Sequence, residues 1–254
     1  MKAMILAAGM GTRLRPLTND RPKALVEVAG RTLLEITLSR MREFGVRQVI
    51  INVHHFAPMI VDYLAANKYF GMHIEISLEE SLLDSGGGLK KATGFLSRPC
   101  SPSEAGAPFI LHNVDVISTI DIDRMKQFHL NNRALATLAV QDRETSRYLL
   151  FDENHQLCGR RAGREGTPQM VRPARETRAQ AFSGIHMISP GIFSLMSEQG
   201  SFSIIDCYLR LAAKGQRIMA FRADEYYWRD LGRPESVALA KQDLARGLFG
   251  SHAT

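Results

Sequence analysis

A group of glycines and cations near the amino terminus has the composition of an anion-binding loop. The stretch AMILAAGMGTRLRPL places an apolar run before Gly9 and Gly11, and Arg13 follows two residues after Gly11. Glycines let backbone N–H groups face an anion without a Cβ in the way, and a guanidinium binds phosphate oxygens as a planar fork. Lys23, which follows Pro22, adds a second cation. The pattern predicts a phosphate site at the end of a strand, and a turn beside two surface cations is the alternative.

Two familiar glycine motifs do not fit this segment. A phosphate loop of the GxxxxGK[ST] type needs a lysine and a hydroxyl residue directly after its last glycine, but Thr12 and Arg13 follow Gly11. A dinucleotide fingerprint needs a third glycine, where Leu14 stands, and an acidic residue at the end of the second strand, which here ends in NVHH. The segment therefore predicts a different kind of phosphate loop.

Strand and helix patterns alternate through the first half of the chain. Short apolar runs predict buried strands, and the helical spacing of Leu34, Leu38, Met41 and Phe44 is typical of the helices between them. The strands are expected at 3–8, 48–53, 72–79 and 109–116, the helices at 32–45 and 57–70, and a glycine-rich turn that opens a helix at 82–96. This order predicts an α/β fold with a doubly wound, mostly parallel, Rossmann-like mixed sheet and helices on both faces.

Three features lie at the carboxyl ends of the predicted strands. They are the loop 9–11, the glycine run 86–88 and Asp115. Because ligands of such sheets bind at this edge, the three features predict one site. The second half is more mixed, with strands expected at 135–142, 181–189 and 216–224, a hairpin at 147–161, an irregular stretch at 162–180, a helix at 203–215 and a last helix after Pro234.

The composition limits the class of protein. The chain has 254 residues, 45% of them apolar, and a formal net charge of +6. No stretch approaches the roughly 18 apolar residues of a membrane span, and the amino terminus lacks the pattern of a signal peptide. Cys100, Cys158 and Cys207 are odd in number and far apart, which favours a reducing cytoplasm over a disulfide framework. Six arginines within 160–178 have no interleaved aromatic residue, which favours a solvated loop over a nucleic-acid surface.

Longer motifs resemble one enzyme family. LAAGMGTRLRPLT at 6–18 and PKAL at 22–25 resemble the signature of the sugar-1-phosphate nucleotidyltransferases. LLDSGGG, HNVDV, FSGIHMISP and WRDLGRPES resemble later motifs of the same family, so the resemblance covers residues 1 to about 245. It implies the nucleotide-diphospho-sugar transferase fold in a single domain, with a nucleotide-binding half over 1–116, a sugar-binding half over 117–245 and a tail over 246–254.

The resemblance also implies a reaction and a role for each matching residue. A nucleoside triphosphate and a sugar 1-phosphate give an NDP-sugar and pyrophosphate, and the phosphate monoester needs no general base because it is mostly dianionic near neutrality. Arg13, Lys23 and Asp115 would be catalytic, and Asp115 and Asp230 would bind Mg²⁺. The implied nucleotide-binding residues are Leu6, Ala7, Ala8, Gly9, Gly11, Thr12, Arg13, Glu79 (or Glu80), Gly86 and Gly87, and the implied sugar-binding residues are Asn113, Arg147 and Gly184.

The sequence departs from the family pattern near the sugar. Val114 replaces the usual glycine of N-G-D, and no Glu-Lys-Pro segment precedes the sugar-binding strand. Arg147, or an arginine of 160–178, is the expected substitute for the lysine of that segment. For Asp115 and Asp230 the alternative to metal binding is a turn or surface carboxylate.

The motifs also suggest a substrate. The short chain, LLDSGGG and HNVDV look most like the N-acetylmuramate 1-phosphate uridylyltransferases, which implies UTP. A mannose-1-phosphate guanylyltransferase that uses GTP is the second interpretation, and a cytidylyltransferase acting on phosphocholine or another polar phosphate is the third. A nucleotide-binding regulatory protein without catalysis is the alternative from another class. We expect a cytoplasmic monomer or homodimer that binds neither nucleic acid nor membrane.

Overall fold

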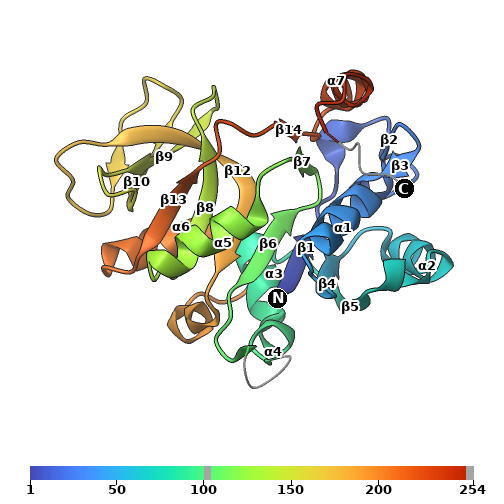
Figure 1. Ribbon diagram of the computed structural model, residues 1–254, viewed down its shortest axis with the longest axis horizontal. Coiled ribbons are helices and arrows are strands. Elements are labelled where there is room, and N and C mark those ends of the chain that lie inside the picture. Colours follow the sequence, from blue (N-terminus) through green and yellow to red (C-terminus); the bar gives the residue numbers. More distant parts are fainter. Residues whose placement is uncertain (100–103, 250–254) are drawn as a thin grey trace. The chain divides into compact units, whose positions relative to one another are not determined.

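The computed structural model describes residues 1–99 and 104–249 (Figure 1). Cys100 and the last five residues of the predicted tail lie outside the described residues. The chain divides into two compact units. The first unit contains Met1–Leu82, His112–Ile120 and the residues from Glu225 onwards, and the second contains Leu83–Leu111 and Asp121–Asp224.

Three parallel strands form the sheet of the first unit (Figure 1). Strand β1 (Lys2–Leu6) pairs with β4 (Gln48–Val53), and β4 pairs with β5 (His73–Leu78). The middle of β1 and most of β4 are buried, as expected for strands covered on both faces. These three strands were predicted from their apolar runs, and the structure confirms them.

Helix α1 (Leu33–Glu43) begins and ends where its sequence requires. The Thr32 hydroxyl accepts a hydrogen bond from the N–H of Glu35 at 3.0 Å, which caps the first turn. Leu38 and its apolar neighbours one turn away on either side are fully buried, as their helical spacing predicts. Gly45 follows the helix with φ of 72°, a conformation that favours glycine.

Two predicted elements of this region need correction. The helix expected over 57–70 is α2 (Ala57–Ala66), which is followed by a separate 3₁₀ turn at Lys68–Gly71 where three successive non-glycine residues have positive φ. The strand expected over 109–116 is interrupted by a turn at 114–115, which separates β6 (Phe109–Asn113) from β7 (Val116–Ser118). Asp115 therefore lies between two strands rather than near the end of one.

Shorter elements complete the first unit. Strand β7 pairs antiparallel with β14 (Trp228–Asp230), and β2 (Glu27–Val28) pairs with β3 (Arg31–Thr32). Two 3₁₀ turns cover Thr12–Leu14 and Lys23–Leu25, and helix α7 (Pro234–Ala245) follows β14. Both of these turns carry predicted phosphate-binding residues.

The second unit has mostly antiparallel pairs among its described strands. Strand β9 pairs with β10 and β12, and β8 pairs antiparallel with β12 and parallel with β13. The bounds are β8 (Ala136–Gln141), β9 (Arg147–Phe151), β10 (Leu157–Ala162), β11 (Gln169–Met170), β12 (Arg178–Ile188) and β13 (Ile218–Arg222). The stretch 162–180, expected to be irregular, thus contains β11 and the start of β12.

The helices of the second unit include the predicted ones at 82–96 and 203–215 and two helical segments that were not predicted, over 122–131 and 190–195. They are α3 (Asp84–Lys91), α4 (Thr93–Leu96), α5 (Ile122–Asn131) and α6 (Ile204–Ala213), and a 3₁₀ segment covers Pro190–Leu195. The glycines at 86–88 lie inside α3 rather than in a turn before it. The predicted α/β fold with a mixed sheet is confirmed. Within the described residues, no helix has the length and apolar character needed to cross a membrane.

Candidate active site

The β7–β14 pair brings the two predicted metal-binding carboxylates together. Asp230 lies opposite Val116 in the ladder, and the N–H of Leu231 donates to the carbonyl of Asp115 at 2.7 Å. Asp115 and Asp230 are therefore neighbours at one end of this two-stranded ribbon. The sequence alone could not show that these two distant residues are neighbours, because their proximity comes from the strand pairing. The use of both carboxylates as metal ligands stays a prediction.

Lys23 forms an ion pair with one of these carboxylates. Its ammonium contacts Oδ2 of Asp115, and the two side chains are 14% and 12% exposed. The 3₁₀ turn that begins at Lys23 directs this contact, and Pro22 precedes it with an extended ψ of 153°. A predicted phosphate-binding cation and a predicted metal ligand thus form an ion pair with each other.

Arg13 and Asp230 meet at Gly232. The N–H of Gly232 donates to Oδ1 of Asp230 at 2.6 Å. A Cβ placed on Gly232 would lie 2.6 Å from the same oxygen and 3.1 Å from Nη2 of Arg13, so a larger residue would displace the ends of these side chains. Gly232 was not among the predicted site residues, although it is the glycine of the WRDLG motif that carries Asp230.

The glycine loop has the conformation that its sequence demands. Gly11 has φ of 66°, and its carbonyl accepts the Thr18 hydroxyl at 2.8 Å and the N–H of Leu14 at 2.9 Å. A Cβ on Gly9 would meet no atom within 4 Å, so open space adjoins its backbone. Arg13, in the following 3₁₀ turn, is exposed. The loop therefore offers accessible backbone N–H groups and the exposed guanidinium of Arg13, which are the two elements of a phosphate site.

Asn52 is a second residue that the sequence interpretation missed. Its Oδ1 accepts the N–H of Ala7 at 2.8 Å, and its Nδ2 donates to Oε1 of Glu79 at 2.8 Å. Glu79 is only 2% exposed, so its carboxylate holds Asn52 and, through it, the loop after β1. The carbonyl of Leu6 likewise accepts the N–H of Val114 at 3.1 Å. A polar residue within the apolar run VIINV was the available signal for Asn52.

The donor set of this region suits a magnesium ion. Two neighbouring carboxylates supply hard oxygen atoms, and Mg²⁺ in phosphate-transfer sites takes one or two carboxylates together with phosphate and water oxygens. In the described part of the chain, no group of three or more His, Cys, Asp or Glu side chains could enclose a metal ion. Asp115 and Asp230 therefore fit a metal that arrives with a phosphate ligand better than a fully enclosed structural metal.

The second unit holds two of the three residues expected at the sugar, whereas Asn113, the last residue of β6, lies in the first unit. Gly184 has φ of 76° and lies in β12, where the register with β8 shifts between Phe182 and His186. Arg147 begins β9 and is exposed. Arg143, which the sequence interpretation did not name, is anchored closer to that irregularity because its Nη2 donates to the carbonyl of Phe182 at 2.7 Å.

The glycines of α3 have a packing role inside the second unit. A Cβ on Gly86 would meet the Phe202 ring and lie 2.8 Å from its carbonyl oxygen, and a Cβ on Gly87 would collide with the carbonyl of Gly200. The N–H of Gly86 also donates to the Phe202 carbonyl at 2.9 Å. Both glycines are therefore needed for the close packing of α3 against the backbone at 200–202. Their contact with a nucleotide stays a prediction.

Most arginines of the 160–178 segment are engaged within the second unit. Arg160 pairs with Asp206 at 2.6 Å, Arg164 with Glu144 at 3.5 Å and Arg172 with Asp152 at 3.3 Å. Arg161 lies over the Tyr148 ring at 5.7 Å. These pairs use the positive charge on the protein's own surface and support the interpretation of a solvated arginine-rich loop.

Comparisons with known proteins agree with this geometry. A family model described as nucleotidyl transferase matches residues 2–247. An N-acetylmuramate alpha-1-phosphate uridylyltransferase of Caulobacter vibrioides is 32% identical over 250 residues, which are 96% of this chain and 96% of that protein. A mannose-1-phosphate guanylyltransferase of Mycobacterium tuberculosis is 28% identical over 99% of this chain and 66% of that protein, so the chain spans about two thirds of this second relative.

A solved structure supports the fold. The crystal structure of HddC from Yersinia pseudotuberculosis complexed with GMP-PN matches 96% of this chain and 99% of that chain with a TM-score of 0.74. Their sequences are 22% identical. At this identity the likeness establishes the arrangement of strands and helices.

Proposed function

The chain belongs to the nucleotidyl transferase family and is a sugar-1-phosphate nucleotidyltransferase, and on this premise we propose that it joins UTP to N-acetylmuramate 1-phosphate. The observation that carries the choice of substrate is the 32% identity to a uridylyltransferase for that sugar over nearly the whole length of both chains. The arrangement of Arg13, Lys23, Asp115 and Asp230 within one unit supports the proposed chemistry.

The proposed reaction is a displacement at phosphorus. An oxygen of the sugar phosphate forms a bond to the α-phosphorus of UTP, and the bond from that phosphorus to the bridging oxygen of the β-phosphate breaks. The products are UDP-N-acetylmuramate and pyrophosphate, and no proton has to be removed from the dianionic nucleophile. The protein therefore has to bring two polyanions into line and to stabilise the charge on the leaving group.

The named side chains meet these two requirements. Arg13 would bind oxygens of the triphosphate and of the departing pyrophosphate, and Lys23 would move from Asp115 to an oxygen of the reacting phosphate. Asp115 and Asp230 would hold a Mg²⁺ ion, which neutralises phosphate oxygens when bound. Asn52 and Glu79 would keep the loop after β1 in place for the uracil base. The sugar contacts of Asn113, Arg147 and Gly184 stay predictions.

Pyrophosphate release tests this proposal. The wild-type protein with Mg²⁺ is assayed with five nucleoside triphosphates against a panel of sugar 1-phosphates that includes N-acetylmuramate 1-phosphate. We expect release with UTP and this sugar, its loss in Asp115→Asn, and its retention in Asp62→Asn, which changes an exposed carboxylate on α2. Release only with another pair of substrates would reject the proposed substrates.

GTP with mannose 1-phosphate is the second candidate pair. It is favoured by the 28% identity to a guanylyltransferase over almost the whole of this chain. The same assay separates the two pairs, and nucleotide binding without release from any pair would favour a regulatory protein. We propose a cytoplasmic monomer or homodimer without nucleic-acid or membrane partners, which light scattering and a flat response to added oligonucleotide and vesicles would support.

A further inference from the structure

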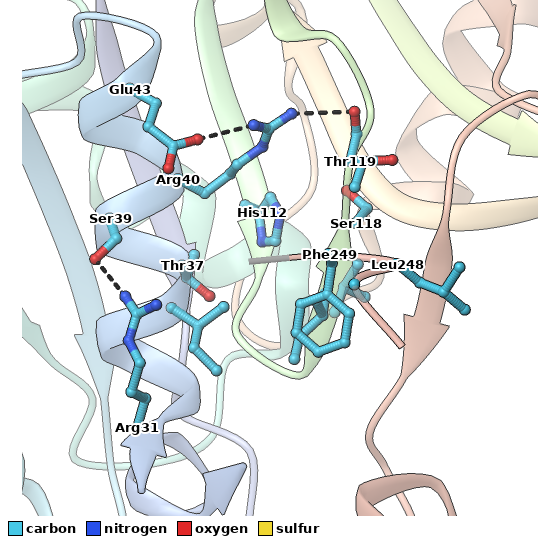
Figure 2. Close-up of a pocket in the computed structure, with 14 residues that line it drawn as sticks. Arg31, Thr37, Ser39, Arg40, Glu43, His112, Ser118, Thr119, Leu248 and Phe249 are labelled. Atoms are coloured by element: carbon cyan, nitrogen blue, oxygen red, sulfur yellow. Dashed lines mark hydrogen bonds and ion pairs between the residues drawn. The ribbon is translucent and has the colours of Figure 1, made fainter. Parts of the chain in front are cut away.

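A cavity of about 360 Å³ lies in the first unit, beside β7 (Figure 2). Its walls come from α1, from β7 with the following Thr119, and from residues 247–249 near the carboxyl end. This volume lies within the range of small-molecule sites. None of Arg13, Lys23, Asp115 and Asp230 lines it. The cavity is therefore distinct from the proposed catalytic site, although β7 begins directly after Asp115.

His112 presents an unused hydrogen-bond acceptor to this cavity. The ring is 3% exposed, and its Nδ1 lies 2.8 Å from the carbonyl of Asn113. Because a carbonyl only accepts, Nδ1 carries the hydrogen and Nε2 carries the lone pair. Burial lowers the pKa of His112 to about 4, so the ring is neutral near pH 7. Nε2 makes no hydrogen bond among the described residues, so this ring nitrogen at the cavity wall is open to a donor from a ligand.

The charges at the cavity are already balanced. Arg40 donates to Glu43 at 2.8 Å and to the carbonyl of Thr119 at 3.0 Å, and Figure 2 shows both contacts. Arg31 pairs with Glu35 at 2.9 Å. Each arginine thus has a glutamate beside it, and the cavity offers no uncompensated cation to a phosphate or carboxylate ligand. The charge balance favours an uncharged ligand.

Apolar surface and hydroxyl groups complete the lining. Phe249 stacks on Tyr227 with ring centroids 5.0 Å apart, and Ile36 adds aliphatic surface from α1. The Thr119 hydroxyl oxygen accepts the N–H of Tyr227 at 3.0 Å, which leaves its own hydrogen available to donate. Ser118 adds a second hydroxyl. A ligand carbonyl can therefore find a donor here, and a flat ring can find apolar contact.

We propose that this cavity binds an uncharged aromatic amide. The amide N–H donates to Nε2 of His112, the amide oxygen accepts from the hydroxyl of Thr119 or Ser118, and the ring packs against Phe249 and Ile36. Such a ligand donates a hydrogen bond to Nε2 of His112, and it brings no charge into a cavity whose arginines are already paired.

Benzamide is the probe that tests the proposal. We expect isothermal titration of the wild-type protein to give saturable binding with Kd on the order of 1 mM, as is usual for a ligand of this size. N,N-dimethylbenzamide keeps the ring and the carbonyl but has no N–H, and benzoate carries a charge. Both should bind at least tenfold more weakly, and equal or tighter binding of either would overturn the proposal.

Two variants locate the binding. Ile36→Trp, at a half-buried position on α1, fills the cavity and should abolish benzamide binding, whereas Leu130→Trp, at an exposed position on α5, should not change it. His112→Phe keeps an aromatic ring at this position but removes the Nε2 acceptor, so it should weaken benzamide binding about tenfold or more. Undiminished binding by Ile36→Trp would place benzamide elsewhere and overturn the proposal. The Ile36→Trp measurement therefore tests the proposal even if His112→Phe does not fold.

Discussion

The N–H of Leu231 donates to the carbonyl of Asp115 at 2.7 Å, and this hydrogen bond fixes the end of the ribbon formed by β7 and β14. Asp230 directly precedes Leu231, so the bond sets the separation of the two carboxylates through the backbone rather than through flexible side chains. If the two carboxylates share a cation, as we propose, the paired strand ends hold them in place for it.

If Asp115 and Asp230 hold one ion, their removal should not be additive. Asp115→Asn and Asp230→Asn should each lower the rate of pyrophosphate release by about a hundredfold or more, because both lose charge stabilisation in the transition state. The double variant should release pyrophosphate almost as fast as the slower of the two single variants, because either substitution alone already removes the metal site. Steady-state rates of the four proteins measure this, and fully multiplicative losses would show that the carboxylates act independently.

Lys23 should compete with a divalent cation for Asp115. Lys23→Met removes the ammonium that contacts this carboxylate, so nucleotide-free protein should bind Mn²⁺ about tenfold more tightly in an electron paramagnetic resonance titration. Lys90→Met is the matched control, because the Lys90 ammonium donates to the carbonyl of Glu198 in the second unit. Unchanged Mn²⁺ affinity in Lys23→Met would contradict the competition.

Gly232→Ala should impair catalysis more than folding. The added Cβ would crowd Oδ1 of Asp230 and Nη2 of Arg13, and both groups would have to move. We expect pyrophosphate release to fall about tenfold or more, with little change in the thermal midpoint because Arg13 is exposed. Gly94→Ala, where the Cβ meets no atom within 4 Å, should keep full activity. Equal activity of the two variants would contradict the crowding argument.

A second substitution should restore stability to an alanine variant of one α3 glycine but not to that of the other. Gly86→Ala and Gly87→Ala should each lower the free energy of unfolding by about 1–3 kcal/mol through overpacking. Phe202→Leu shortens the side chain that the first Cβ meets, so it should restore part of the loss in Gly86→Ala. It should not help Gly87→Ala, whose Cβ meets the backbone carbonyl of Gly200. Urea denaturation of the singles and doubles gives the comparison, and equal rescue of both would refute it.

His129 should make the protein less stable in mild acid. Its Nδ1 lies 2.9 Å from the Thr137 hydroxyl and its Nε2 lies 2.8 Å from the Ser189 hydroxyl, and burial lowers its pKa to about 4. The unfolded chain, with an ordinary pKa near 6.5, takes up a proton first as the pH falls, so stability is lost between these two values and is full above the higher one.

This linkage predicts a loss of about 2 kcal/mol of unfolding free energy between pH 7 and pH 5 from His129 alone. His129→Gln should reduce the difference between the two pH values by this amount in urea denaturation, whatever its stability at pH 7. His73→Gln, which changes an exposed histidine, should leave the difference unchanged. An unchanged difference in His129→Gln would show that another group dominates the acid response.

The sequence alone determined the local chemistry of this protein. The stretch from Leu6 to Thr18 carries the residues proposed to bind phosphate within a few positions of one another, so spacing and glycine conformation are enough to predict them. The alternation of strands and helices likewise predicted the parallel strands of the first unit, because hydrophobic periodicity is a local signal.

Only the tertiary structure decided which distant groups meet. The pairing of β7 with β14 places Asp230 beside Asp115, and burial directs Glu79 to Asn52 rather than outward. The glycines at 86 and 87 have the same composition as a flexible turn, yet contact with the segment 200–202 places them inside a helix. Such contacts depend on how elements pack across long stretches of chain, and neither residue type nor local spacing encodes that packing directly.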